Sequence, residues 1–284
     1  DPANKIDGIR DLLIEDGKIA DCRDAKFCVS TSADQIIDAT GMIVMPGIVD
    51  MHVHLREPGR EDKETIASAT KAALRGGVTS VLAMPNTMPA IDSIENIELL
   101  KSAIKRTADA NVFICGAITK ARLRKEPADI ANLKKKGAAA ISDDGVSCDD
   151  DNVFLEALKL AQKAGILRIC HSEDKALANN GVVNFGFTST RMGLRGITKE
   201  SEYKRVERDI QLAVKAKANI HIAHVSCAES IEIIAQAKKK GVKVTAEVTP
   251  HHLSLTEEAV LDYDPNFKMN PPLRAKEDVL ALRE

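Results

Sequence analysis

The segment from Val44 to Gly59, VMPGIVDMHVHLREPG, places His52 and His54 one residue apart at the end of an apolar run. Successive residues of a β-strand point to opposite faces, so the two imidazoles share a face if the run is a strand. Two imidazoles held on a rigid strand can bind one divalent cation. The same spacing occurs in loops whose histidines are merely hydrogen-bonded, so the pair alone does not decide between a metal site and a structural role.

Three further apolar runs end in side chains of the same kind. His171 ends ILRICHSE, His224 ends IHIAHVS, and an aspartate ends AAAISDDG. Imidazole nitrogens with a carboxylate suit zinc or a similar first-row metal. Together with the first pair they exceed the ligands of one tetrahedral zinc with an open position, which predicts two cations sharing a bridging carboxylate. Asp143 and Asp144 compete for that bridge, and local reasoning does not choose between them.

Other polar residues on the same rim have the chemistry to contact a substrate. Arg56 continues the face of the histidine pair, and its guanidinium can hold a carboxylate through two hydrogen bonds; the alternative is a salt bridge to Glu57 or Glu61. Asn86 lies in MPNT and Asn270 in MNPPLR, where each can instead form a turn. The remaining histidines are expected to be structural or to shape the mouth of the site rather than to bind a cation: His221, His251 and His252.

A recurring junction indicates which elements position these residues. A helical pattern, a glycine and a short apolar run follow one another repeatedly, which predicts seven strands starting near residues 48, 78, 111, 138, 166, 219 and 243. Such βα units predict an α/β fold of the (β/α)8 TIM-type barrel kind. A doubly wound open sheet is the second choice. It is disfavoured because the first βα turn lacks a glycine fingerprint and the candidate residues end several strands rather than one pair.

The two ends of the chain do not fit a complete barrel. Before Ile48, DLLIEDGKIADC and QIIDATGMIVMPG predict short strands with turns, hence part of a small β domain over residues 1–47 beside a barrel over residues 48–284. The last residues, AKEDVLALRE, predict a helix, so we expect the eighth strand to lie beyond the end of this chain. The connection from His171 to the strand near residue 219 is long, as are loops that cover the active sites of barrels.

Composition excludes several classes of function. A net charge of −2 gives no electrostatic basis for binding nucleic acid or an anionic membrane. No apolar run reaches the roughly 20 residues that span a bilayer, and no signal peptide is recognisable. The six cysteines are scattered without a CxxC pair, which is typical of reduced thiols in the cytoplasm.

Seven motifs occur in order along the chain: DMHVHLREPG, MPNT, ISDDG, CHSE, AHVS, TPHHL and MNPPLR. With them the sequence resembles the dihydroorotases of the bacterial and archaeal type, in the amidohydrolase superfamily. The resemblance implies a distorted barrel with a small β-sandwich built from both chain ends. It also implies reversible cyclisation of N-carbamoyl-L-aspartate to L-dihydroorotate in de novo pyrimidine biosynthesis, a homodimer, and possible association with aspartate carbamoyltransferase.

The resemblance assigns a role to each ligand. It implies two zinc ions (Zn2+) per chain, the first bound by His52 and His54, the second by His171 and His224, with Asp144 as the bridge. This type of dihydroorotase differs from dihydropyrimidinases (hydantoinases), allantoinases and animal-type dihydroorotases, which bridge their metals with a carboxylated lysine. The corresponding run here, GAAAISDDG, contains no lysine.

The resemblance also implies that Arg56 and Asn86 hold the substrate carboxylate and that Asn270 contacts the substrate near its ring. In the family an aspartate on the eighth strand is the general acid and base, and we expect it beyond the end of this chain. Two alternatives stay open. One is another cyclic amidase of the allantoinase or hydantoinase type. The other is a non-catalytic scaffold subunit, against which the intact ligand set speaks.

Overall fold

The computed structural model describes residues 3–24 and 33–284, which divide into two compact units, residues 1–47 and 48–284. In the first unit, β1 (Arg10–Glu15) and β2 (Lys18–Asp24) form an antiparallel hairpin. Asp16 and Gly17 connect them with φ of 50° and 72°, the left-handed conformation that tight hairpin turns require. The short strand predicted within QIIDATGMIVMPG is not formed: residues 35–47 have no strand partner among the described residues, and an extended segment becomes a strand only when a neighbour completes its hydrogen bonds.

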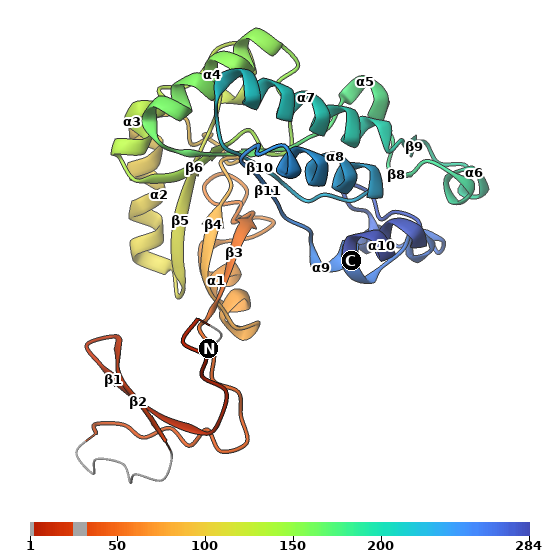
Figure 1. Cartoon of the computed structure of the whole chain (residues 1–284). Coiled ribbons are helices and arrows are strands. Elements are labelled where there is room, and N and C mark those ends of the chain that lie inside the picture. Colours follow the sequence, from red (N-terminus) through yellow and green to blue (C-terminus); the bar gives the residue numbers. More distant parts are fainter. Residues whose placement is uncertain (1–2, 25–32) are drawn as a thin grey trace. The chain divides into compact units, whose positions relative to one another are not determined.

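The second unit is built on a curled parallel sheet (Figure 1). Its seven strands begin within one residue of the predicted positions: β3 (Ile48–Val53), β4 (Val78–Ala83), β5 (Asn111–Gly116), β6 (Ala138–Ser142), β7 (Leu167–Cys170), β10 (Ile220–Ile222) and β11 (Val244–Ala246). The strands pair strictly in chain order, from β3 at one edge to β11 at the other. A doubly wound sheet would reverse its order at a switch point, so the barrel-type α/β fold is confirmed. Among the described residues, the sheet does not close between β3 and β11.

Helices alternate with these strands as predicted: α1 (Ile66–Arg75), α2 (Ile94–Thr107), α3 (Ile130–Lys135), α4 (Asp151–Ala164), α7 (Glu200–Ala216), α8 (Ala228–Lys239), α9 (Pro250–Ser254) and α10 (Lys276–Arg283). Glycines between helix and strand adopt the left-handed conformation that ends helices, with φ of 78° at Gly77 and 63° at Gly165. The helical pattern EDKETIASATKAALR predicts a helix over residues 61–75, but α1 begins five residues later, because Thr65 caps it in a capping box with Ser68. No helix of the described residues is long and apolar enough to cross a membrane.

Both faces of the sheet are buried toward the carboxyl ends of β4, β5, β6, β7 and β10, as is typical of parallel strands, whereas most of the edge strand β3 is exposed. The outer face packs against the helices in a large aliphatic core. The inner face forms a second cluster contributed by β4, β5, β6, β7 and the residue that follows β10: Leu82, Met84, Cys115, Ala140, Ile169 and Ala223. This inner layer of close-packed side chains supports the carboxyl ends of the strands.

The long connection between β7 and β10 is folded. Before α7 it contains α5 (Lys175–Ala178), β8 (Val183–Asn184), α6 (Phe187–Met192) and β9 (Gly196–Ile197), with β8 and β9 paired in parallel. Figure 1 shows α6 and the β8–β9 pair projecting beyond the N-terminal end of α7. Val183 and Met192 pack there against Val260, in the short 3-10 helix Glu257–Val260. The rest of the chain between α9 and α10 carries another 3-10 helix, Pro265–Phe267, and Lys120–Arg122 forms a third after β5.

Candidate metal centre

The carboxyl ends of four strands, the edge strand β3 and the adjacent strands β6, β7 and β10, bring five predicted ligands together. His52 lies in β3 and His54 directly after it, while His171 follows β7 without a gap. Asp144 and His224 each come two residues after the end of their strands, β6 and β10. In a parallel barrel these ends meet at one rim, where such sites are built.

The carboxylate of Asp144 is the centre of the cluster. Its Oδ1 lies 3.2 Å from His52 Nε2, 3.5 Å from His224 Nε2 and 3.6 Å from His171 Nδ1, and its Oδ2 lies 3.4 Å from His54 Nε2. His171 Nδ1 is also 2.8 Å from His224 Nε2. Ligand atoms of His52, Asp144 and His224 all fall within 4.8 Å of one another, close enough for one cation to touch all three.

The neighbouring aspartate does something different. Asp143 accepts hydrogen bonds from the backbone nitrogens of Ile118 (2.9 Å) and Thr119 (3.2 Å) and from the Thr119 hydroxyl (2.5 Å). It ties the end of β6 to the end of β5. Asp144, whose own nitrogen is held by Ser142 Oγ at 3.0 Å, is thereby the aspartate that faces the imidazoles. These contacts favour Asp144 over Asp143 as the candidate ligand.

Two of the four imidazoles are fixed by a hydrogen bond between their second nitrogen and an outer oxygen, and a third has a carboxylate nearby. His52 Nδ1 lies 2.6 Å from Glu247 Oε1, and His54 Nδ1 lies 3.0 Å from Asn86 Oδ1. His171 Nε2 lies 3.5 Å from Glu173 Oε2, a longer contact. An outer oxygen of this kind fixes the ring orientation and the tautomer of a metal-binding histidine.

Sequence reasoning missed Glu173 and Glu247. Each stands at the carboxyl end of a strand, Glu173 in CHSE two residues after His171 and Glu247 directly after β11. Applying the strand-end rule to every carboxylate, and not only to histidines and the SDDG pair, would have found both.

The electrostatics of the cluster favour positive charge. Burial opposes protonation of His52, but Asp144 and Glu247 outweigh it and raise the pKa of His52 to about 10. Burial acts against His171 too, and Asp144 with Glu173 raises its pKa to about 9. Although burial disfavours its anion, the surrounding histidines hold the pKa of Asp144 well below its usual range. Such a cluster releases protons when a cation replaces them.

The remaining features also fit a cation. Burial lowers the pKa values of His54 and His224, which keeps these two rings neutral and able to donate a lone pair. The buried Oδ1 of Asp144 has no hydrogen-bond partner, and an unpaired carboxylate oxygen is costly unless a cation or donor reaches it. His224 has a φ of 37°, a strained conformation for a non-glycine residue of the kind that accumulates at functional sites. The donors present therefore suit one or two divalent first-row cations.

The three residues predicted to contact the substrate, Arg56, Asn86 and Asn270, differ from one another in the contacts they make. β3 ends before Arg56, which has a φ of 60°, so strand alternation does not reach it; its charge nevertheless acts on the pKa of His54. The alternative salt bridges of Arg56 are not formed among the described residues, because Glu57 and Glu61 instead accept backbone N–H groups. Asn86 is the outer partner of His54. Asn270 is exposed and donates its Nδ2 to Glu173 Oε2 at 2.7 Å.

Of the other histidines, His221 and His252 make hydrogen bonds that hold structure, and the ring of His251 lies against that of His252 with centroids 4.7 Å apart. His221 bonds through Nδ1 to Thr245 Oγ1 at 2.8 Å and through Nε2 to Glu247 Oε2 at 3.1 Å, so it holds the carboxylate that in turn holds His52. His252 lies between Thr249 Oγ1 (2.7 Å) and the carbonyl of Pro271 (3.0 Å) and joins α9 to the MNPPLR loop.

A parallel α/β barrel sheet with a histidine–carboxylate cluster at its carboxyl rim is an arrangement typical of a metal site. The family model described as dihydro-orotase-like matches residues 41–230, and this chain belongs to that family. A dihydroorotase of Elusimicrobium minutum (strain Pei191) is 55% identical over 284 residues, which cover all of this chain and 65% of that protein. A dihydroorotase of Pelotomaculum thermopropionicum is 47% identical over 282 residues, 99% of this chain and 65% of that protein.

Solved structures share the fold. The L-hydantoinase (dihydropyrimidinase) from Arthrobacter aurescens superimposes with a TM-score of 0.84 at 22% identity, over 96% of this chain and 62% of that one. At this identity the likeness supports the barrel architecture and says nothing of the substrate. This chain therefore spans just under two thirds of the length of these relatives.

Proposed function

We propose that this chain carries the metal site of a dihydroorotase, which interconverts N-carbamoyl-L-aspartate and L-dihydroorotate in de novo pyrimidine biosynthesis. The observation that carries the proposal is the central carboxylate. Asp144 stands among four imidazoles at the end of a strand whose residues, Ala138–Ser142, include no lysine. Hydantoinase-type relatives would need a carboxylated lysine at that point. The names of the relatives at 47% and 55% identity agree with this choice.

The site is proposed to hold two zinc ions. His52 and His54 would bind the first, His171 and His224 the second, and Asp144 would bridge them. When bound, the ions lower the pKa of water from 15.7 to roughly 7, which supplies a nucleophile for the ring amide near neutral pH. Glu247 and Asn86 keep the outer nitrogens of His52 and His54 engaged, so that their inner nitrogens remain free as ligands, and Glu173 Oε2 lies 3.5 Å from the outer nitrogen of His171.

The protein's own residues would bind and orient the substrate. We infer that Arg56 receives the substrate carboxylate, because its guanidinium is unpaired among the described residues and lies close enough to His54 to affect its pKa. Asn86 uses its Oδ1 for His54, which leaves its amide nitrogen to donate to the same carboxylate. Asn270, exposed on its loop, would contact the substrate near the ring. Such positioning lowers the barrier by orienting the reacting groups before attack.

We assign proton transfer to a residue other than the proposed metal ligands and substrate contacts. Closing the sheet between β11 and β3 requires one more parallel strand. The family resemblance places the aspartate that acts as general acid and base there. Residues 1–47 would belong to the small β-sandwich domain. We also infer a cytoplasmic homodimer that associates with aspartate carbamoyltransferase.

The test compares substrates and variants of the full-length protein that carries this chain. We expect it to convert L-dihydroorotate and carbamoyl-L-aspartate into each other, to lose this activity on treatment with a chelator, and to regain it with zinc. Turnover of allantoin or a hydantoin in preference to dihydroorotate would identify another cyclic amidase. Binding of zinc without turnover of any of these substrates would identify a scaffold subunit.

Arg56→Ala gives the sharper discrimination between the enzyme classes. If Arg56 holds the substrate carboxylate, its removal raises KM for dihydroorotate by about 100-fold and leaves an uncharged ring substrate almost unaffected. Lys120→Ala is the matched control, since Lys120, in the 3-10 helix after β5, is a cation that is paired only with Glu126 among the described residues. Equal effects on charged and uncharged substrates would contradict the assignment.

A further inference from the structure

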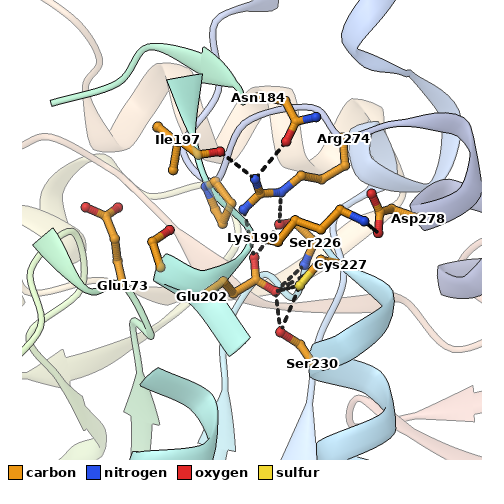
Figure 2. Close-up of polar contacts among 12 residues, drawn as sticks. Glu173, Asn184, Ile197, Lys199, Glu202, Ser226, Cys227, Ser230, Arg274 and Asp278 are labelled. Atoms are coloured by element: carbon orange, nitrogen blue, oxygen red, sulfur yellow. Dashed lines mark hydrogen bonds and ion pairs between the residues drawn. The ribbon is translucent and has the colours of Figure 1, made fainter. Parts of the chain in front are cut away.

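A buried ion pair lies beside the metal centre, between Arg274 of the MNPPLR loop and Glu202 at the start of α7. The two residues are only 1% and 4% exposed, and Arg274 Nη2 lies 3.6 Å from Glu202 Oε2. Figure 2 shows the guanidinium surrounded by groups from other segments. A charge buried this deeply persists only when a partner and hydrogen bonds compensate it.

Arg274 connects its loop to two further segments. Its Nε donates to Ser226 Oγ at 3.0 Å, and its Nη1 donates to Asn184 Oδ1 at 2.9 Å and to the carbonyl of Ile197 at 3.0 Å. Asn184 and Ile197 belong to the β8–β9 pair, and Ser226 lies in the β10–α8 connection, two residues before α8 begins. The planar guanidinium presents its donors in fixed directions, so these contacts define the position of the loop as well as its charge balance.

Glu202 completes the arrangement from the other side. Its Oε1 accepts from the backbone nitrogen of Ser226 at 2.9 Å and from Ser230 Oγ at 2.8 Å, and its Oε2 accepts from Ser226 Oγ. No buried polar atom of Arg274, Glu202 or Ser226 lacks a hydrogen-bond partner. We call these three residues with Asn184 the Arg274 clamp.

The clamp is directly connected to the candidate site. Ser226 follows His224 by two residues, and Asn270 precedes Arg274 by four, with Pro271 and Pro272 between them. Proline fixes its own φ and limits the residue before it, so the position of Arg274 is transmitted along the loop. Asn270 then meets Glu173, the outer partner of His171.

We propose that the Arg274 clamp positions the loop of residues 270–274 against the rim of the metal centre, which makes Arg274 a positioning residue for the substrate contact of Asn270. The inference rests on the proposed function for the role of Asn270. The placement of the loop itself does not depend on that function. If the clamp only stabilised the fold, any positive charge opposite Glu202 would be enough at residue 274. If the clamp positions the loop, residue 274 must also donate hydrogen bonds in several fixed directions, which arginine does.

Arg274→Lys separates the two roles, because lysine keeps the charge opposite Glu202 but cannot donate to Ser226, Asn184 and Ile197 together. In the full-length protein we expect KM for dihydroorotate to rise by about tenfold, kcat to fall by less than about threefold, and bound zinc to stay constant. Hydrogen exchange of residues 268–275 should become faster. Arg168→Lys is the matched control: Arg168 is equally buried and donates to Ile166, Leu158 and Gln162, none of them in the loop.

The control should leave KM and loop exchange unchanged even if it lowers the melting temperature. If Arg274→Lys does not fold, Ser226→Ala removes one acceptor of Arg274 and should show the same changes to a smaller extent. Unchanged KM together with unchanged loop exchange in the folded variant would overturn the inference. If the parent protein does not act on dihydroorotate, the proposed function fails, and hydrogen exchange of the loop alone decides whether the clamp positions it.

Discussion

Two buried clusters of charged side chains lie next to each other in the unit of residues 48–284, and they differ in how completely they are satisfied. In the Arg274 clamp each buried polar atom of the ion pair has a hydrogen-bond partner. In the metal centre, the equally buried Oδ1 of Asp144 has none, although three imidazole nitrogens lie within 3.6 Å of it. The hydrogen bonds formed on folding therefore satisfy the first cluster completely. The second cluster keeps a buried carboxylate oxygen without a hydrogen-bond partner, as is expected of a site that binds a ligand.

This difference teaches that burial and charge alone do not identify a functional site. Both clusters contain a carboxylate buried to a few per cent exposure, and in both the neighbours lower the pKa of that carboxylate against the effect of burial. What separates them is the identity of the neighbours. Arg274 has only donors and a permanent charge, whereas imidazoles can exchange their protons for a cation.

Removal of the central carboxylate should have the largest effect. Asp144→Ala takes away the atoms that both cations would share, so we expect bound zinc to fall from about two ions per chain to fewer than one, with no detectable activity. Metal analysis after gel filtration measures this. Zinc should also raise the melting temperature of the parent and not of the variant, since only a ligand of the folded state stabilises it. A variant that retains both ions would show that Asp144 is not the bridge.

Neutralisation of the carboxylate in the clamp should act on stability instead. Glu202→Gln leaves the buried Arg274 without a counter-charge, and we expect a loss of about 3–5 kcal/mol in the free energy of unfolding. Chemical denaturation measures that loss, and metal analysis should find the parent's zinc content in the folded variant. Loss of zinc without loss of stability would reverse the distinction between the two clusters.

The outer partner of His52 should have an intermediate effect. Glu247→Gln keeps the shape of the side chain but weakens its hydrogen bond to His52 Nδ1, so we expect zinc affinity to fall by about 10–100-fold. Competition with a chromogenic chelator measures the affinity. An unchanged affinity would mean that the backbone, and not Glu247, orients the ring.

Asp143→Asn is the smallest change and the closest control for Asp144. The substitution weakens the bonds to Ile118 and Thr119, and we expect the free energy of unfolding to fall by about 1–3 kcal/mol with zinc binding preserved. Thermal unfolding in the presence and absence of zinc distinguishes the effects. A loss of zinc equal to that of Asp144→Ala would show that both aspartates take part in the metal site.

The order of strands and the five candidate ligands could be predicted because both follow from local sequence. A glycine after a helix and an apolar run after the glycine fix where each strand begins, and the strand end fixes where its histidine or aspartate lies. The start of α1 was predicted too early because the cap at Thr65 interrupts a continuous polar pattern.

The rest depends on contacts between residues distant in sequence. Asp143 and Asp144 are adjacent and identical, and only Thr119, on another strand end, separates their roles. The partners Glu247 and Glu173 were missed because a carboxylate gives no signal until the imidazole it faces is known. The Arg274 clamp joins four segments, and no local pattern marks Arg274 as buried or Glu202 as its partner.

Anomalous diffraction at the zinc absorption edge, from crystals of the full-length protein grown with zinc, tests the central claim most directly. We predict two peaks beside the carboxylate of Asp144, one within bonding distance of His52 and His54 and the other within bonding distance of His171 and His224. The absence of any peak among these five side chains, with zinc bound elsewhere or not at all, would contradict the account.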